Sequence, residues 1–193
     1  YTLWLVGSVR CVSETDSDES FSFLIIEGRI VNPHSRVDLT NERLEELTRV
    51  NFNNLPFKKA IKVVKGNGKR RIAVFSDVDC PFCKKLERET IAKLDNITVY
   101  NFLYPLAIHP DAKSKSAQIW CAPDRVKAWN NAMVLGELTE NKDDCETPIN
   151  DTISLARDLG ITSTPTIILS SGKQLPGALP AEDLEKYLDG TYD

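Results

Sequence analysis

One short stretch constrains this chain more than any other. Residues 76–87 read SDVDCPFCKKLE, so two residues separate Cys80 from Cys83. The apolar run RIAVF comes directly before this stretch, and a charged run typical of a helix follows the cysteines. A cysteine pair at such a junction could bind a metal ion, close a structural disulfide or carry out thiol chemistry.

The redox interpretation explains this pair best. A zinc site needs four ligands, usually two close pairs, but neither His34 nor His109 stands at a paired spacing. We expect both histidines to be ordinary surface or loop residues. A structural disulfide across so short a loop would constrain the unfolded chain little. At a helix N-terminus, however, free backbone N–H groups and the helix dipole stabilise a Cys80 thiolate. Pro81 suits the first helical turn, and Cys83 lies one turn further on.

A second motif agrees with the first. Residues 160–166 read GITSTPT and lead into the apolar run TIIL. A proline that enters a strand is normally confined to an edge, a strand start or a special turn, so Pro165 could simply begin the strand. The sharper hypothesis is a cis-proline whose loop packs beside the CxxC pair. The backbone of Thr164 would then be available to hold an extended peptide.

The rest of the chain has a mixed α/β pattern after residue 59. We expect a hairpin that joins residues 60–64 to residues 71–75 across the Asn67-Gly68 step. Further along, the pattern predicts the following elements: a helix from the CxxC to about Leu94, a strand at residues 97–104, mostly helical sequence over residues 112–133, a helix over 149–159 that stops at Gly160, a hairpin across Ser171-Gly172, and a last helix between Pro180 and Gly190.

The first part of the chain is different. Residues 1–6, 8–12 and 21–32 are of β type, and the acidic run at 14–19 is expected to be a solvated hairpin tip rather than a cation site. A helix capped by Thr40 or Asn41 would follow. Its apolar face would carry Leu44, Leu47 and Val50.

Size and charge exclude several classes of function. A chain of 193 residues with 41% hydrophobic content can bury a full core and fits one medium domain plus a small one. The net charge of −4 offers no basic stripe for nucleic acid. No stretch is as long and apolar as a membrane span requires. No charged-then-apolar leader opens the sequence, so we expect a mature or trimmed chain without its signal peptide.

Taken together, the motifs resemble a known family. A strand, a CxxC at a helix start, further helices, then a Thr-Pro step into a hairpin and a last helix resemble the thioredoxin fold. Longer segments resemble the periplasmic disulfide isomerases of the DsbC type, from about Ile72 to the end. These segments are VFSDVDCPFCKKLE, AQIWCAPDRVKAW, the DDC at 143–145 and LGITSTPTIILSSGKQLPGALPAEDLEKYL. FLIIEGRIVN followed by VDLTNE resembles the end of that family's dimerisation domain and the start of its linker helix.

The resemblance implies an α/β fold class: a thioredoxin fold with an inserted helical segment, preceded by a small β-rich, dimerisation-like domain and a linker helix. We place the dimerisation-like domain at residues 1–38, the linker helix at 39–58 and the thioredoxin-fold catalytic domain at 59–193. The N-terminal portion looks short for the family, as if its first helix were missing.

The resemblance also implies roles for single residues. Cys80 would attack and Cys83 would resolve, while Thr164, the cis-proline Pro165, Pro81 and Phe82 would bind the substrate. Cys121 and Cys145 would form the family's structural disulfide, whose separation corresponds to roughly 3.5 kcal/mol of stabilisation by chain entropy. Neither a metal ion nor a cofactor is implied.

The family further implies partners and a location. The expected partners are misfolded clients that contain disulfides, a second copy of the chain in a homodimer, and a membrane-bound disulfide reductase of the DsbD type. The expected location is the oxidising periplasm of a bacterium.

Three positions depart from the family pattern. The CxxC interior is Pro-Phe where the best-known isomerases have Gly-Tyr, and these residues help to set the reduction potential. Val74 stands where thioredoxin has a buried carboxylate, so general-base help cannot come from that position. Cys11 has no counterpart in the family, and we expect a buried free thiol or, less simply, an intermolecular disulfide.

Three functions are therefore compared. The leading hypothesis is an isomerase, in which the Cys80 thiolate forms a mixed disulfide with a wrongly paired client. A thiol oxidase with a DsbA-like role would use the same fold but rest with Cys80 and Cys83 oxidised. A chaperone-like module would bind peptides around Phe82 and Pro165 without redox turnover.

Overall fold

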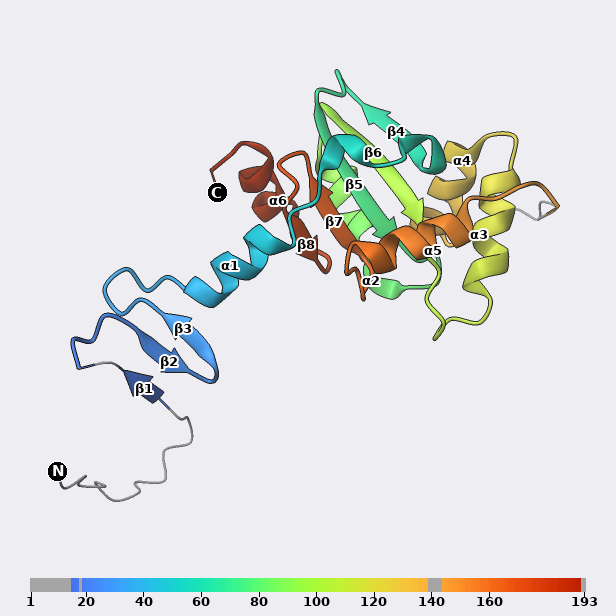
Figure 1. The fold of residues 1–193 in the computed structure, drawn as a ribbon. Coiled ribbons are helices and arrows are strands. Elements are labelled where there is room, and N and C mark those ends of the chain that lie inside the picture. Colours follow the sequence, from blue (N-terminus) through green and yellow to red (C-terminus); the bar gives the residue numbers. More distant parts are fainter. Residues whose placement is uncertain (1–14, 18, 139–143, 192–193) are drawn as a thin grey trace. The chain divides into compact units, whose positions relative to one another are not determined.

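The structure is a computed structural model that describes residues 15–17, 19–138 and 144–191. The chain divides into two compact units, Tyr1–Leu47 and Thr48–Asp193 (Figure 1). The expected strands at residues 1–6 and 8–12, and Cys11 with them, lie outside the described residues. None of the described helices is long and apolar enough to cross a membrane.

The first unit contains a small antiparallel sheet and one helix. The sheet has the order β1-β2-β3, and its strands are β1 (Thr15–Ser17), β2 (Leu24–Ile26) and β3 (Arg29–Val31). The acidic run was therefore interpreted wrongly as a hairpin tip, because its middle forms β1 and pairs with β2. Glu27 and Gly28 both have positive φ in the tight turn between β2 and β3.

Helix α1 (Leu39–Leu47) is shorter than the sequence suggested. Its cap is Asp38, whose Oδ1 accepts a hydrogen bond from the Asn41 N–H at 2.8 Å, so the expected caps Thr40 and Asn41 were wrong. Val50 lies beyond the helix, where its N–H donates to the carbonyl of Gly172. Two short 3-10 turns follow α1 before the main sheet: η1 (Phe52–Asn54) and η2 (Phe57–Lys59).

The second unit is built on a five-stranded mixed sheet with the order β4-β6-β5-β7-β8 (Figure 1). Strands β5 and β6 are parallel, and the other neighbouring pairs are antiparallel. The bounds are β4 (Ile61–Lys65), β5 (Arg70–Ser76), β6 (Ile97–Leu103), β7 (Thr166–Leu169) and β8 (Gln174–Pro176).

The hairpin expected between β4 and β5 is wrong, because β6 lies between these two strands. The intervening turn bends around the start of β6 instead. Gly66 and Gly68 both have positive φ, and the Asn67 N–H donates to the side chain of Asn96. Strand β6 is almost entirely buried, so a central position with a neighbour on each side satisfies its backbone and covers its side chains.

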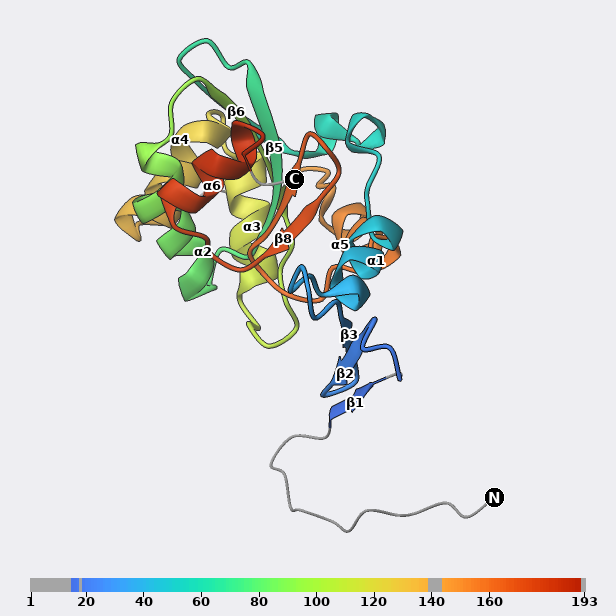
Figure 2. The same cartoon turned by 90° about the vertical axis from the view of Figure 1, so that its left-hand side faces the viewer.

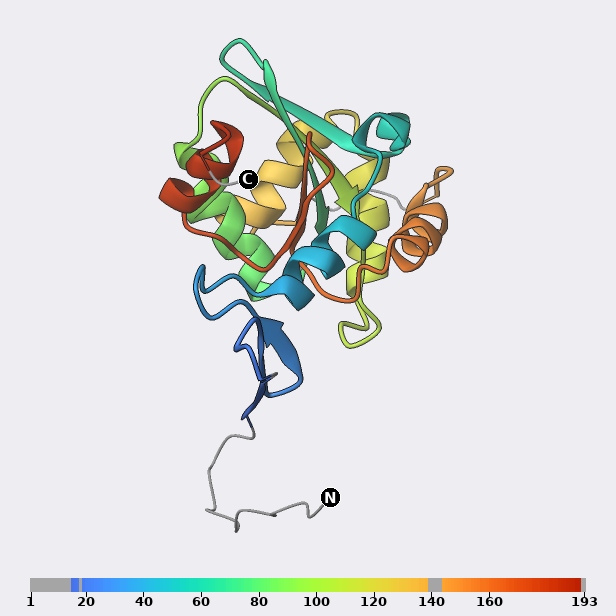
Figure 3. The same cartoon turned by 60° about the vertical axis from the view of Figure 1, so that its left-hand side comes forward.

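Helices cover both faces of this sheet (Figures 2 and 3). Ile72 and Val74 of β5 pack with helical residues from the CxxC helix and α6, whereas the alternating Ala73 and Phe75 pack with α5 and the 3-10 turns. The helices are α2 (Pro81–Lys85), α3 (Ala112–Cys121), α4 (Arg125–Asn130), α5 (Ile149–Asp158) and α6 (Ala181–Leu188). A π segment η3 (Leu86–Thr90) and a 3-10 turn η4 (Ile91–Lys93) continue α2, and a π segment η5 (Asn131–Leu135) continues α4.

Candidate active site

The two cysteines stand where the sequence placed them, at the junction between β5 and the CxxC helix. Cys80 is the N-cap of α2, and its carbonyl accepts the first helical hydrogen bond, from the Lys84 N–H at 3.1 Å. Pro81 occupies the first turn, where a missing N–H leaves no intrahelical bond unmade. Both cysteines are free thiols; Cys80 is 5% exposed and Cys83 is fully buried. Cys80 is thus the more exposed of the two thiols.

The Thr164-Pro165 peptide bond is cis, and its loop lies against Cys80. The Cys80 thiol donates to the backbone oxygen of Thr164, with 3.4 Å between sulfur and oxygen. This contact arises because β7, which begins directly after the loop, pairs antiparallel with β5, which ends just before the CxxC. The two motifs found in the sequence therefore form one site.

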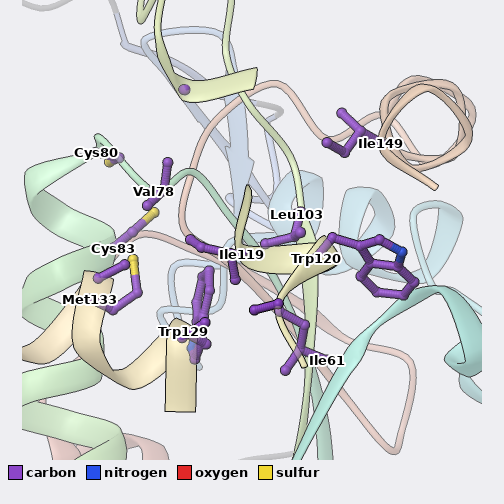
Figure 4. Packing of buried hydrophobic residues seen from close by; sticks show 14 residues of the cluster. Ile61, Val78, Cys80, Cys83, Leu103, Ile119, Trp120, Trp129, Met133 and Ile149 are labelled. Carbon is purple, nitrogen blue, oxygen red and sulfur yellow. The ribbon is translucent and has the colours of Figure 1, made fainter. Parts of the chain in front are cut away.

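Cys83 is directed into the protein interior. Figure 4 shows its side chain within a buried cluster that includes Val78 and Met133. The Asp77 N–H donates to its sulfur at 3.4 Å. Burial raises the pKa of Cys83 to about 12, although the hydrogen bond from the Asp77 N–H lowers it. Cys83 is therefore a thiol that resists ionisation in the folded chain.

Asp77 ties the CxxC loop to the segment after β6. Its carboxylate is fully buried and accepts hydrogen bonds from the backbone N–H groups of Asp79 and Leu106. The same carboxylate lies 3.0 Å from Nδ1 of His109. His109 thus lies in a loop, as expected, but its contact with Asp77 was not predicted; His34 is exposed, as expected. This set of contacts fixes the backbone immediately before Cys80.

A second carboxylate, Asp79, directly precedes Cys80. The ammonium group of Lys115, on α3, lies 2.7 and 2.9 Å from its two oxygens. The side chains of Asp79 and Lys115 are 21% and 33% exposed, so the ion pair sits at the surface rim of the site.

Glu87 is a third acidic group near the cysteines, four residues after Cys83 on the same helical segment. It is 5% exposed, and its carboxylate accepts a hydrogen bond from the indole of Trp129 at 3.2 Å. Burial raises the pKa of Glu87 to about 7, against the lowering effects of Trp129 and of the charge on Lys65. Val74 is completely buried, as its apolar position requires.

The remaining predicted site residues lie in different surroundings. Phe82 is 62% exposed beside the cysteines, and Pro81 is also exposed. Cys121, the last residue of α3, is joined to Cys145 by a disulfide. Cys121 also packs against the buried cluster that contains Cys80 and Cys83. Among the described residues, no three His, Cys, Asp or Glu side chains gather as a metal site would require.

Sequence reasoning missed Asp77, Asp79, His109, Lys115 and Glu87. Asp77 and His109 are 32 positions apart, and Asp79 and Lys115 are 36 positions apart, so no local spacing could reveal these two pairs. Glu87 had a visible signal. It follows Cys83 by four residues, and the buried Cys83 and Leu86 show that this part of the helix faces the core.

Comparisons with known proteins identify the fold and the family of the chain. A family model described as a thioredoxin-like domain matches residues 57–191. The probable thiol:disulfide interchange protein DsbC of Bordetella pertussis is 42% identical over 172 residues, which make up 89% of this chain and 60% of that protein. The thiol:disulfide interchange protein DsbC of Escherichia coli is 32% identical over 171 residues, or 86% of this chain and 69% of that protein.

Solved structures give the same picture. A disulfide interchange protein from Neisseria gonorrhoeae is 43% identical and superposes with a TM-score of 0.67 over 70% of this chain and 97% of its own. Proteus mirabilis ScsC in a compact conformation has a TM-score of 0.56 over 79% of this chain and 86% of its own; at 17% identity it shares the fold alone. The chain spans about three fifths of the length of the Bordetella relatives that it matches.

Proposed function

Because the chain belongs to the thioredoxin-like family, among the thiol:disulfide interchange proteins of the DsbC type, we propose that it rearranges wrong disulfides in client proteins. One observation carries the proposal. The Cys80 sulfur lies at a helix start beside the backbone of Thr164, while Cys83 is buried one turn deeper. This arrangement suits a nucleophile that meets an extended peptide and a second thiol that acts later.

The proposed reaction begins with the Cys80 thiolate. It attacks one sulfur of a client disulfide, forms a new S–S bond to that sulfur, and the other client sulfur leaves as a thiolate. A different client thiolate then attacks the mixed disulfide, which pairs the client cysteines anew and releases Cys80 unchanged. No electrons are gained or lost overall, so the cycle is an isomerisation.

Cys83 can end a mixed disulfide that does not rearrange. When no client thiol completes the exchange, the Cys83 thiolate attacks the Cys80 sulfur, the client leaves reduced, and a Cys80–Cys83 disulfide forms. The raised pKa of Cys83 makes this attack slow at neutral pH. Slow attack by Cys83 lengthens the lifetime of the mixed disulfide and gives the client time to rearrange. This favours isomerisation over simple reduction.

Substrate binding is assigned to the residues around Cys80. Phe82 and Pro81 offer exposed apolar surface on one side of the sulfur, and Thr164 and Pro165 form the other side. An extended client segment along Thr164 would present its disulfide to Cys80, with main-chain hydrogen bonds that are independent of client sequence.

The proposed setting follows from the same family. The chain would act in the bacterial periplasm as a homodimer, on misfolded clients that contain disulfides. A membrane-bound disulfide reductase of the DsbD type would return the Cys80–Cys83 disulfide to the dithiol. Nucleic acid is not a proposed partner, since the net charge is −4.

Refolding of a scrambled, disulfide-rich client tests the proposal. The reduced chain should restore client activity without added oxidant, Cys80→Ser should abolish this effect, and Cys83→Ser should retain part of it because Cys80 still forms mixed disulfides. If only the oxidised chain acts, and only on reduced clients, the protein is a thiol oxidase. If Cys80→Ser with Cys83→Ser still suppresses client aggregation and the wild type does not reshuffle disulfides, the protein is a peptide-binding chaperone.

A further inference from the structure

Two carboxylates stand within the three residues that precede the nucleophile, in the sequence Asp77-Val78-Asp79-Cys80. Negative charge close to a thiol opposes its ionisation, and only the thiolate attacks a disulfide. An uncompensated pair of carboxylates would therefore slow the proposed reaction. In the structure, both carboxylates have a partner from the segment after β6: Asp77 contacts His109, and Asp79 contacts Lys115.

We propose that Lys115 is a positioning residue that neutralises Asp79 and so keeps Cys80 reactive at neutral pH. This inference rests on the proposed function, in which Cys80 is the attacking thiolate. The ammonium group lies within 2.9 Å of both oxygens of Asp79, so it offsets the carboxylate as a whole. The pair is partly shielded from water, which weakens screening by solvent.

Asp77 needs no such lysine. Its fully buried carboxylate accepts two backbone N–H groups as well as the contact with His109. The backbone N–H dipoles stabilise the negative charge of Asp77 inside the fold. Asp79, by contrast, directly precedes Cys80 in the chain, and the structure gives it Lys115 as its charged partner. This ion pair therefore decides how much of the Asp79 charge is left uncompensated.

Glu87, four residues after Cys83, is buried, and its carboxylate accepts a hydrogen bond from the Trp129 indole rather than from Lys115. The remaining groups around Cys80 also leave this role to Lys115. Cys83, behind the nucleophile, is neutral at pH 7 because its pKa is about 12. The facing loop at residues 161–166 reads ITSTPT and contains no titratable side chain. The CxxC helix carries Lys84 and Lys85, which follow Cys83 in the sequence, and Lys85 pairs with Glu89 across 3.9 Å.

Alkylation of Cys80 measures this effect directly. The full chain is reduced, and its reaction with iodoacetamide is followed at the peptide level across about pH 4 to 9, so that Cys80 is separated from the other cysteines. The variants are Lys115→Met, Asp79→Asn and the double variant Asp79→Asn/Lys115→Met. Lys113→Met is the matched control, because it removes one positive charge from the same helix without touching Asp79.

Because Lys115 and Asp79 carry opposite charges, their removal should shift the pH midpoint of Cys80 alkylation in opposite directions. Lys115→Met should raise the pH midpoint of Cys80 alkylation by roughly half a unit to one unit, because Asp79 is left uncompensated. Asp79→Asn should lower the midpoint, because the ammonium group then acts on Cys80 alone. The double variant should return close to the wild-type midpoint, and Lys113→Met should not move it. A lysine that only braces the fold would give no such sign pattern.

Three results would overturn the inference. The first is a Lys115→Met midpoint no higher than that of Lys113→Met, and the second is a double variant that keeps the shift of the single one. The third is a pH midpoint of Cys80 alkylation in Asp79→Asn that is equal to or higher than that of the wild type. If circular dichroism shows that Lys115→Met is unfolded, this third measurement alone tests the inference. Alkylation needs no client, so failure of the isomerase proposal leaves this test intact, and a failed test leaves isomerisation possible.

Discussion

The sulfur of Cys80 lies 3.4 Å from the backbone oxygen of Thr164, although the two residues are 84 positions apart in the chain. The antiparallel pairing of β5 with β7 produces this proximity, since one strand ends before Cys80 and the other begins after Pro165. The Cys80 thiol and the backbone of the cis-proline loop thus lie together at neighbouring ends of β5 and β7. The chemistry of the site follows from how differently its two thiols are placed.

We predict that native, reduced protein is alkylated at Cys80 and not at Cys83. Burial raises the pKa of Cys83 to about 12, so the thiol stays protonated at pH 7, and its side chain is fully buried. Peptide mapping after brief iodoacetamide treatment measures both sites. Cys83 should become reactive only on unfolding, and it should stay protected in Cys80→Ser. Labelling of Cys83 as fast as Cys80 would reverse the assigned roles.

Glu87 predicts a specific dependence of stability on pH. Its pKa is about 7 in the folded chain against an ordinary value of 4.5, so the fold favours the protonated form. The stabilising contribution is fully present below about pH 4.5 and is lost as pH rises through about 7. Glu87→Gln keeps an acceptor for the Trp129 indole and removes the titration. The variant should be more stable than the wild type at pH 8 by up to roughly 3 kcal/mol.

Denaturant unfolding at several pH values checks the Glu87 prediction. The difference in unfolding free energy between Glu87→Gln and the wild type should grow from pH 5 to pH 8 and then level off. Glu89→Gln is the control, because its side chain is 63% exposed on the same helical segment. Its profile should run parallel to that of the wild type. Parallel profiles for Glu87→Gln as well would mean that Glu87 is not buried as the structure places it.

The disulfide between Cys121 and Cys145 should stabilise the fold without taking part in exchange. The bond closes a loop with a sequence separation of 24, which corresponds to roughly 3.5 kcal/mol of chain entropy. Replacement of both cysteines by serine should lower the unfolding free energy by about that amount and leave the alkylation rate of Cys80 unchanged. A loss below about 1 kcal/mol, or a slower Cys80, would contradict a purely structural role.

Much of the fold of residues 59–193 could be predicted because its signals are local. Gly160 ends α5, Gly190 follows α6, and the hairpin of β7 and β8 forms across Ser171-Gly172 as expected. The pairing of β4 with β5 failed for a physical reason. The Asn67-Gly68 step predicts a turn but not the partner of each strand, and the more buried β6 takes the place between them.

Only those site residues that belong to short sequence motifs could be predicted. Cys80, Cys83 and Pro165 stand in short patterns whose chemistry is plain from sequence. The ion pair of Asp79 with Lys115 has a separation of 36 residues and depends on where α3 packs. Charge on a helix normally faces solvent, so Lys115 carried no signal of its own. Such long-range pairs become visible only when the chain is folded.

The last prediction concerns the small unit at the start of the chain. Among its residues 16–17 and 19–47, whose burial the structure describes, none is buried, and each of its three strands has three residues. Apolar side chains stay in contact with water there: Phe21 is 61% exposed, Ile30 42%, Leu44 54% and Leu47 65%. So small a sheet is marginal by itself, and a patch of this kind normally marks a contact surface. A second copy of the chain would cover it by two-fold pairing.

We therefore expect a homodimer joined through residues before about 36, with two CxxC sites available to one client. Sedimentation at micromolar concentration should give twice the chain mass of 21.7 kDa. Ile30→Lys, in the register opposite Ile25, should shift the chain to monomer and weaken isomerisation of scrambled clients. Val64→Lys is the control, since Val64 is 53% exposed on β4 of the other unit, and it should remain dimeric. A wild-type monomer that still reshuffles scrambled disulfides would show that the activity needs no dimer.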